Sequence, residues 1–233
     1  MKIVILTGAG ISAESGIQTF RASDGLWEGH RIEDVASPEG FVRHPEVVHQ
    51  FYNARRRQLM SESVVPNAAH RALAKLQRAL PERVTLVTQN VDDLHERGGS
   101  TKVIHMHGEL LKVCCQGCGE VFIHRDDCSP AHACTACRRV GELRPDIVWF
   151  GEMPKAMNEI YSALEKADLF VAIGTSGHVY PAAGFVDVAN AAGAKTLELN
   201  MDVSLVTSVF DEARQGLASA LVPEWVDQVL SHA

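Results

Sequence analysis

The sequence lacks any hydrophobic run long enough to cross a membrane, since none approaches the roughly 20 residues that a transmembrane helix needs. The opening MKIVILTGAG has neither the length nor the small-residue cleavage site of a secretion signal. Positive charge is not in excess either, because 22 Lys and Arg stand against 29 Asp and Glu, a formal net charge of -7. Binding to a nucleic-acid backbone needs a basic field. We therefore predict a cytoplasmic protein that binds neither membranes nor nucleic acid.

Aromatic residues are also scarce, at 6% of the chain, whereas hydrophobic residues reach 46%. That hydrophobic fraction is ordinary for a globular domain and argues against disorder. The length of 233 residues is large for one core and small for two independent ones. A single core with an inserted lobe is therefore expected, in a monomer whose acidic surface favours basic, lysine-bearing partners.

Short apolar runs alternate with helical stretches along the chain. The runs that predict strands are 3–6, 84–88, 147–150, 169–173 and 196–199. The stretches that predict helices are 44–60, 68–80, 155–166, 182–192 and 224–230. Strands separated by helices predict an α/β fold with a doubly wound, parallel, Rossmann-like sheet. Most of the runs are apolar nearly throughout, as expected of strands covered on both faces.

Two stretches interrupt this alternation. Residues from about 22 to 65 are too long for one crossover, and residues from about 111 to 143 contain all six cysteines. We interpret both as insertions that together form a smaller zinc-binding and helical lobe. The Rossmann-like lobe then comprises residues of about 1–21, 66–110 and 144–233, within a single domain of 1–233.

Four of the cysteines form two Cys-x-x-Cys pairs, Cys115 with Cys118 and Cys134 with Cys137, with 15 residues between the pairs. In a chain without an export signal, this spacing favours metal over disulfides. Four thiolates close a tetrahedron around zinc and leave no position for water. One structural zinc per chain is therefore predicted, with free or redox-active thiols as the alternative. Cys114 and Cys128 have no partner at a matching spacing.

A glycine-rich loop, Gly8-Ala9-Gly10, follows the first predicted strand. Small residues there let backbone N–H groups approach a pyrophosphate at a helix N-terminus. The third glycine of the dinucleotide fingerprint is absent, because Ala13 stands in its place. By itself the loop is weak evidence, since a tight strand-to-helix turn explains it nearly as well. Ligands of open parallel sheets bind at the carboxyl ends of the strands, where 88–90 and 174–176 also fall.

The wider context is more specific. In order along the chain stand the motifs Gly8-Ala9-Gly10-Ile11-Ser12, Gly16-Ile17-Gln18-Thr19-Phe20-Arg21, Thr88-Gln89-Asn90-Val91-Asp92, His107-Gly108, Phe150-Gly151-Glu152 and Gly174-Thr175-Ser176. This series resembles the sirtuin family over residues 3 to about 229. The two cysteine pairs lie between the His-Gly and Phe-Gly-Glu motifs, where that family places its zinc. Met106 and Glu109 depart from the common pattern without putting a catalytic group in doubt.

The resemblance implies an enzyme that removes acyl groups from protein lysines and consumes NAD. Sirtuins cleave the bond between nicotinamide and ribose and capture the sugar with the acyl oxygen, which yields free lysine, nicotinamide and O-acyl-ADP-ribose. His107 matches the catalytic base that takes a proton from a ribose hydroxyl. Asn90, also expected to be catalytic, and Asp92 match the residues that hold the ribose and the nicotinamide carboxamide.

Further NAD contacts follow from the same resemblance. Phe20 would shield the reacting sugar from water, with plain core packing as its alternative, and Arg21 would meet phosphate. A helix N-cap is the alternative for Ser176. The NAD-binding residues expected are Gly8, Ala9, Gly10, Ile11, Ser12, Glu14, Thr19, Phe20, Arg21, Trp27, Gln89, Asn90, Val91, Asp92, Gly174, Thr175, Ser176, Asn200, Met201, Asp202 and Ala218.

The acyl-lysine peptide is expected to add as a strand between two segments of the protein, through main-chain bonds that tolerate many sequences. Tyr52 and Arg55, three residues apart on a predicted helix, match the Tyr-x-x-Arg motif of sirtuins that remove succinyl and malonyl groups. A guanidinium and a phenol suit the distal carboxylate of such groups, and an amphipathic surface helix is the alternative. We expect deacetylase and desuccinylase activity, with substrate contacts from Tyr52, Arg55, Val148, Phe150, Gly151, Glu152 and Val179.

Three other functions compete with this interpretation. An NAD-dependent ADP-ribosyltransferase would share the glycosidic cleavage, but the His107 base favours deacylation. A zinc-ribbon binding module without activity would leave the motifs at 89–92 and 107–108 unexplained. An ordinary dehydrogenase is disfavoured by the incomplete glycine fingerprint.

Overall fold

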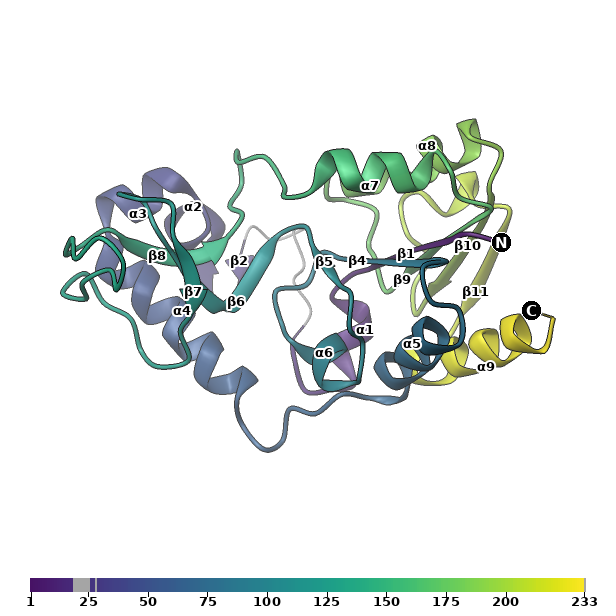
Figure 1. Ribbon diagram of the computed structural model, residues 1–233, viewed down its shortest axis with the longest axis horizontal. Coiled ribbons are helices and arrows are strands. Elements are labelled where there is room, and N and C mark those ends of the chain that lie inside the picture. The colour runs from purple at the N-terminus through teal and green to yellow at the C-terminus, as the bar shows by residue number, and fades with distance from the viewer. Residues whose placement is uncertain (19–25, 28, 233) are drawn as a thin grey trace.

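The larger lobe is built on a six-stranded sheet in which neighbouring strands run parallel (Figure 1). The computed structural model describes residues 1–18, 26–27 and 29–232. The strands, in spatial order, are β11 (Glu212–Gln215), β10 (Lys195–Asn200), β9 (Leu169–Ile173), β1 (Ile3–Thr7), β4 (Val84–Thr88) and β5 (Ile104–His105). From β1 the sheet continues through β4 to β5 on one side, and from β9 it continues through β10 to β11 on the opposite side. The loops that follow β1 and β9 therefore lead to opposite faces of the sheet and leave a crevice between them.

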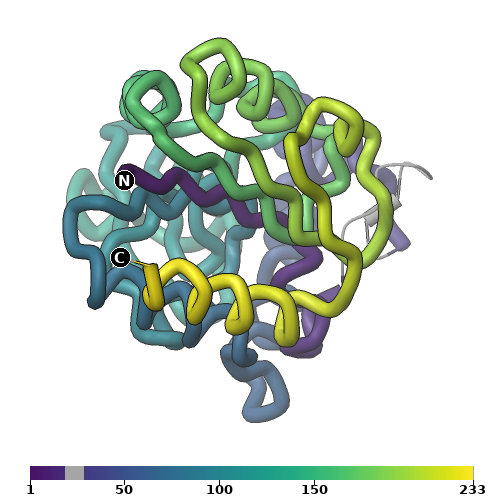
Figure 2. Tube along the Cα trace, turned by 90° about the vertical axis from the view of Figure 1, so that its right-hand side faces the viewer, coloured from purple at the N-terminus to yellow at the C-terminus, as the bar shows by residue number. Residues whose placement is uncertain are grey.

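Helices cover both faces of this sheet (Figures 1 and 2). One face carries α5 (Ala68–Ala79) and α9 (Ala218–Ser231), together with the short α1 (Gly10–Ala13) and α6 (Leu94–Arg97). The other face carries α7 (Met157–Leu164), α8 (Phe185–Ala191) and the 3-10 turns η2 (Ala182–Gly184) and η3 (Thr207–Val209). Ile3 and Ile5 pack toward the first set, and Val4 and Leu6 toward the second. This two-sided burial explains why β1 is apolar throughout.

The smaller lobe lies at the end of the molecule away from both termini (Figure 1). It contains α2 (Ile32–Val35), α3 (Pro38–Arg43), α4 (Pro45–Leu59), the ribbon β2 (Leu26–Trp27) with β3 (His30–Arg31), and an antiparallel sheet of β7 (Val121–Ile123), β6 (Gly108–Cys115) and β8 (Leu143–Ile147). Val48 and Phe51 of α4 share one core cluster with Leu111 and Ile147 of the sheet. The two insertions therefore form one smaller lobe, which confirms the predicted fold class.

One predicted strand of the main sheet is wrong. Residues 143–147 form β8 of the smaller sheet, antiparallel to β6, and 148–150 lie outside it. This run is apolar because Ile147 and Trp149 pack into the core of the smaller lobe, beside Val35 and Phe41. An apolar run by itself does not tell which layer covers it.

The remaining differences concern short or late-starting elements. The strand β11 was not predicted, because a four-residue strand carries little periodicity. Helix α9 begins at Ala218 and contains Pro223, whereas the predicted helix begins after that proline. Across the part of the chain that the structure describes, no helix is both long and apolar enough to span a bilayer.

Candidate functional site

The loops that follow β1 and β9 touch at the crevice. The N–H of Gly10 donates to the carbonyl of Gly174 at 2.9 Å. A Cβ at Gly8 would lie 2.7 Å from that carbonyl oxygen, and a Cβ at Gly10 would lie 2.7 Å from Gly174 Cα. Side chains at positions 8 and 10 are therefore excluded by backbone packing. The predicted glycine loop is thus built as a close approach of two backbones at the switch point of the sheet.

A buried polar network extends from this loop to the end of β4. The Nδ2 group of Asn90 donates to the Gly8 carbonyl and to Ser12 Oγ, both at 3.1 Å. The Ser12 hydroxyl in turn donates to Asp92 at 2.9 Å. An amide, a hydroxyl and a carboxylate gathered in this way match the hydroxyl and carboxamide groups of a nicotinamide nucleotide. Asn90, Ser12 and Asp92 thus fit the NAD-binding role expected of them.

Asp92 is 6% exposed. Burial raises its pKa to about 6, although hydrogen bonds from the Leu94 N–H and Ser12 oppose that rise. A carboxylate removed from water is costly unless it is bonded, and such groups concentrate at functional sites. The raised pKa of this buried carboxyl therefore makes Asp92 a candidate functional residue.

His107 lies half-buried in the turn between β5 and β6, beside this network. Its Nδ1 is 3.0 Å from the carbonyl oxygen of Gln89. A carbonyl only accepts, so Nδ1 carries the proton in the neutral ring and Nε2 keeps a lone pair. Burial lowers the pKa of His107, with the Gln89 bond opposing it. The ring is therefore a neutral base at physiological pH.

Gly108 fixes the path of the chain directly after this histidine. Its φ is +83°, and a Cβ there would lie 1.9 Å from the Asp146 carbonyl oxygen. Only glycine fits such a position. The His107 carbonyl accepts from the Val148 N–H at 2.9 Å. The His-Gly motif thus joins the larger lobe to the segment expected to bind the peptide.

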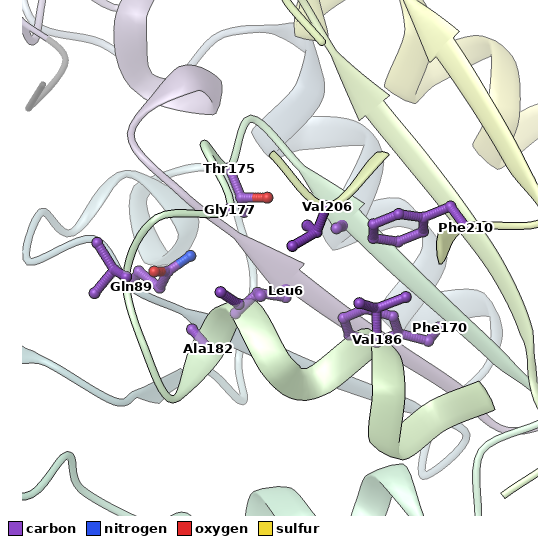
Figure 3. A pocket seen from close by; sticks show the side chains of 12 residues that line it. Leu6, Gln89, Phe170, Thr175, Gly177, Ala182, Val186, Val206 and Phe210 are labelled. Carbon is purple, nitrogen blue, oxygen red and sulfur yellow. The ribbon is translucent and has the colours of Figure 1, made fainter. Parts of the chain in front are cut away.

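The side chain of Gln89 points into a narrow cavity below the loop that follows β9 (Figure 3). Leu6, Phe170 and Val186 line its apolar floor, and Thr175 lies at its rim. Gln89 is half-buried, and its N–H donates to the Thr7 carbonyl at 2.9 Å. The main chain of Gln89 therefore holds the strand ends together, while its amide faces the cavity.

The residues expected to bind the adenosine side of NAD differ in how many hydrogen bonds they already make within the protein. The Asn200 amide donates to the Thr175 carbonyl at 2.6 Å and accepts from the Met201 N–H at 3.1 Å. Ser176 Oγ accepts from the His178 N–H at 3.4 Å in a local turn, and the next helical turn is η2. A helix N-cap at Ser176 is therefore wrong. Thr175 is buried.

Other expected contacts lie around α1 and the start of α9. The Glu14 carboxylate accepts from the backbone N–H of Ser219 at 3.0 Å and from its hydroxyl at 2.6 Å, next to Ala218. Glu14 thus serves an end of α9 that has no other side-chain cap. Ile11 is fully buried in the core, so only its backbone is available to a ligand.

The other predicted NAD-binding positions differ in how exposed they are, and some of them lie outside the described residues. Ala9, Gly174 and Val91 are half-buried, and Met201 and Asp202 are exposed beyond the end of β10. Thr19, Phe20 and Arg21 lie outside the described residues. Trp27 is described only through the backbone of β2.

On the peptide side, Tyr52 of α4 is fully buried. Its phenol oxygen accepts from Trp149 Nε1 at 2.9 Å. The guanidinium of Arg55, one helical turn away, lies 5.2 Å from the centre of the Phe51 ring. Trp149 adjoins Val148, so the phenol is tied to the segment that bonds His107. Tyr52 is thus a core residue as well as a candidate ligand.

Trp149 and Arg144 were not among the residues predicted from the sequence. The Arg144 guanidinium lies 3.5 Å from the centre of the Trp149 ring and pairs with the Glu152 carboxylate at 2.7 and 2.9 Å. Burial raises the pKa of Glu152, but the Arg144 bonds outweigh it and lower the pKa overall. Glu152 therefore orients this segment, in which Phe150 and Gly151 are exposed, and Val179 in the loop after β9 is half-buried. The sequence feature that could have indicated Trp149 is its position directly before the Phe150-Gly151-Glu152 motif.

The predicted zinc ligands gather in the smaller lobe. The Sγ atoms of Cys115, Cys118, Cys134 and Cys137 all lie within 4.8 Å of one another. The Cys115–Cys137 and Cys118–Cys134 sulfur distances are 3.7 and 3.8 Å. Sulfurs at the corners of a tetrahedron around zinc lie about 3.8 Å apart, given a Zn–S bond of about 2.3 Å. The four thiols therefore fit a structural zinc.

The two cysteine pairs are folded alike. The residue four positions after the first cysteine of each pair, Gly119 or Arg138, has a positive φ, +78° or +65°. Each donates its N–H to the carbonyl of that first cysteine, at 2.8 Å to Cys115 and 3.0 Å to Cys134. Two matching turns thus present the four thiols. Cys114 and Cys128 lie outside this set.

A pair of buried histidines lies below the polar network. The rings of His70 and His95 are 5.0 Å apart, and His95 Nε2 lies 2.9 Å from the Thr7 hydroxyl. Burial lowers the pKa of His70 to about 4 and that of His95 well below its usual value. Both rings are therefore neutral at pH 7, and the folded state resists protonating them.

His70→Gln is expected to make the protein less sensitive to acid. Below the ordinary pKa of 6.5 the unfolded chain protonates His70 while the fold does not, down to about pH 4. When the pH falls from about 7.5 to about 5, the free energy of unfolding of the wild type should therefore decrease by about 2 kcal/mol more than that of the variant. Glutamine keeps the capping-box acceptor toward Asn67. Denaturant unfolding at the two pH values measures the difference, and equal losses would contradict it.

Comparisons with known proteins agree with this geometry. The Sir2 family model matches residues 8–181. A protein of Escherichia coli K12 named NAD-dependent protein deacylase is 62% identical over 98% of this chain and 82% of its own length. A protein of the same name from Vibrio parahaemolyticus is 60% identical over 98% of this chain and 95% of its own.

Solved structures are similar over the same extent. A Sir2 homologue in complex with NAD aligns with a TM-score of 0.88 and 39% identity, covering 99% of this chain and 90% of that one. A Sir2 protein bound to acetylated peptide aligns with a TM-score of 0.79 and 30% identity, covering 99% and 92%. The family match spans the glycine loop, His107 and all four cysteines, and so the chain belongs to the Sir2 family.

Proposed function

We propose that the protein is an NAD-dependent protein-lysine deacylase in which His107 is the catalytic base. The observation that carries the proposal is the Gln89 carbonyl bond to His107 Nδ1, which leaves Nε2 basic beside the buried Asn90–Ser12–Asp92 network. Relatives about 60% identical and named NAD-dependent protein deacylase support it. So does the similarity to a Sir2 protein bound to acetylated peptide.

In this mechanism each group of residues has a separate task. NAD would supply a sugar carbon, at which the bond to nicotinamide is replaced by a bond to the acyl oxygen of the modified lysine. Asn90 and Asp92 hold hydroxyl and carboxamide groups in fixed positions. His107 Nε2 accepts a proton from a sugar hydroxyl, and its neutral state near pH 7 makes it available for that step. Zinc, held by the four cysteines, supplies folding energy and no chemistry.

The products of the purified enzyme test this proposal. With NAD and an acetyl-lysine peptide, we expect free lysine peptide, nicotinamide and O-acyl-ADP-ribose in equal amounts. An ADP-ribosyltransferase would instead leave the acyl group in place and label protein with ADP-ribose. Mass spectrometry of peptide and protein distinguishes the two, and modified protein with an intact acyl peptide would overturn the proposal.

We also propose that the enzyme removes succinyl and malonyl groups besides acetyl groups. Tyr52 and Arg55 lie on one helix of the smaller lobe, and Trp149 links Tyr52 to the peptide-binding segment. A guanidinium and a phenol suit a distal carboxylate. An acetyl group lacks that carboxylate and does not depend on the pair.

Arg55→Met is expected to raise KM for a succinyl-lysine peptide while sparing the acetyl-lysine peptide. Losing a hydrogen bond to a charged group costs about 1.5–3 kcal/mol, which is roughly a 10- to 150-fold change. Arg57→Met is the matched control, since Arg57 lies on the same helix, exposed and paired with Asp127. Equal losses of Arg55→Met on both peptides would show that Arg55 only supports the fold.

We further propose that residues 1–233 act as one catalytic unit, a monomer in the cytoplasm, on lysine-bearing proteins. The shared core between the two insertions supports one unit. The net charge of -7 suits basic partners. Light scattering across a range of concentrations tests the monomer, and a mass that rises to a dimer would overturn it.

A further inference from the structure

A second histidine, His105, lies two residues before the proposed base and has no role in the mechanism above. It ends β5, and its side chain is 9% exposed. Its Nε2 is 2.8 Å from a carboxylate oxygen of Glu96 and 3.7 Å from one of Glu109. Its Nδ1 is 3.4 Å from the carbonyl oxygen of Asn90.

These contacts determine the protonation of the ring. A backbone carbonyl accepts and never donates, so Nδ1 must carry hydrogen to bond Asn90. An ionised carboxylate likewise only accepts, so Nε2 must carry hydrogen to bond Glu96. A ring that donates from both nitrogens is an imidazolium. His105 therefore differs from His107, whose Nε2 is left as a base.

The two histidines hold neighbouring carbonyls of one segment. His107 bonds the carbonyl of Gln89, and His105 bonds the carbonyl of Asn90. Register pairs Thr88 with His105, so both rings stand at the carboxyl end of β4. The segment that carries Asn90 and Asp92 is thus docked on the strand end through two imidazoles.

We propose that His105 is a positioning residue, an imidazolium held by Glu96 and Glu109 that fixes the Asn90 backbone and thereby sets the affinity of the site for the nicotinamide end of NAD. The inference rests on the proposed function only for the identity of that ligand. It adds a charge requirement to a reaction whose base is neutral.

The charged surroundings agree with this assignment. Glu96 and His95 face His105 from α6, Glu109 faces it from β6 with Lys112 paired behind, and Asp92 faces it from the loop after β4. His95 is neutral and so does not compete for the carboxylates. Burial alone lowers the pKa of His105, but Glu96 and Glu109 outweigh it and raise the pKa above its ordinary value.

Two amide variants that differ in length separate the two bonds of the ring. His105→Asn places an amide donor near the Nδ1 position, toward Asn90, and gives up Glu96. His105→Gln reaches toward Glu96 and gives up Asn90. We expect both variants to raise Kd and KM for NAD, because both lose the charge of the ring. His105→Gln should lose roughly 10- to 100-fold, the scale of a small misplacement in a site, and more than His105→Asn, which keeps the bond to Asn90. Equal losses, or a larger loss for His105→Asn, would overturn the proposal.

Glu96→Gln tests the charge itself. Without that carboxylate the ring should lose its proton within the assay range, so NAD affinity should fall as pH rises from about 6 to 8.5. In the wild type the same fall should begin at a higher pH, because Glu96 and Glu109 raise the pKa of His105. Asp227→Asn is the control, because it removes an exposed carboxylate paired with Lys75 far along the chain. A Glu96→Gln profile parallel to that of the wild type would count against the imidazolium.

Nitrogen NMR of the folded protein gives a readout independent of activity. At pH 6.5, the ordinary pKa of a histidine, we expect both ring nitrogens to be protonated in most His105 rings and only one nitrogen in most His107 rings, because the pKa of His105 is raised and that of His107 is lowered. A His105 ring that is neutral under these conditions would refute the assignment. Thermal melting of every variant shows whether it is folded. Because NMR and NAD affinity need no acyl substrate, a failed deacylase assay would leave this result standing.

Discussion

His107→Asn is expected to lose about two to four orders of magnitude in deacylation while it keeps its fold and its affinity for NAD, the usual range for a general base. Asparagine places an amide donor near the Nδ1 position, so the bond to the Gln89 carbonyl is preserved. It has no group at Nε2. The variant therefore removes the base and little else.

His107→Ala provides the comparison. If Nε2 acts as the base, the asparagine and alanine variants should be impaired to a similar degree. If His107 only holds Gln89, asparagine should restore most of the rate that alanine loses. Single-turnover rates with saturating NAD, together with calorimetric NAD affinity, distinguish these outcomes. Near-normal turnover in either folded variant would remove His107 from the mechanism.

The pH dependence follows from the same geometry. Burial lowers the pKa of His107, so the base loses its proton at a lower pH than an ordinary histidine. The base is active only when deprotonated, and the acid limb of the rate should therefore lie below about pH 6.5. An acid limb above that value would assign it to another group.

Removing zinc is expected to unfold the part of the smaller lobe around the four cysteines and to abolish activity. Structural zinc contributes roughly 10 kcal/mol or more in small zinc-binding units. The buried cluster around the site consists of Val113, Leu143 and three cysteines, Cys115, Cys128 and Cys134. So small an apolar core does not sustain a fold by itself. The metal therefore replaces a core here.

Loss of this unit should reach the acyl-binding helix. The Asn53 side chain bonds both the N–H and the carbonyl of Cys128, at 2.9 and 2.8 Å. The buried Arg56 guanidinium bonds the carbonyls of Asp126 and Leu110, each at 3.2 Å. Helix α4, which carries the proposed acyl-binding residues, is thus fastened to the chain around the metal. Discrimination between acyl groups should decline before the larger lobe melts.

Metal analysis and two variants test this expectation. We expect one zinc per chain in the wild type and none in Cys118→Ser/Cys134→Ser. Cys114→Ser is the control, because Cys114 is half-buried and lies outside the four-sulfur cluster. It should keep its zinc and its activity. A double variant that remains folded and active, or a wild type without zinc, would contradict a structural metal.

The local sequence pattern was enough to predict much of the secondary structure and the metal ligands. A strand such as 3–7 is apolar throughout because helices cover both its faces, and the same run is visible in the sequence. The spacing of Cys115, Cys118, Cys134 and Cys137 fixes two turns of equal geometry, so the metal site could be predicted from the sequence alone. The His107-Gly108 motif predicted the base through its resemblance to the sirtuin family, and the structure shows that glycine is obligatory where the chain turns into β6.

Packing between segments far apart in the sequence determined the features that local pattern did not predict. The apolar run at 147–150 lies in the smaller lobe because Ile147 and Trp149 pack beside Phe41 and Val35, a choice that no periodicity encodes. His105 and His107 look alike in the sequence, yet one faces a carbonyl and two carboxylates and the other a single carbonyl. Composition and spacing along the chain therefore determined the elements, the metal ligands and the motifs. Only the tertiary structure determined their charge states and layers, because both depend on which groups far apart in sequence come into contact.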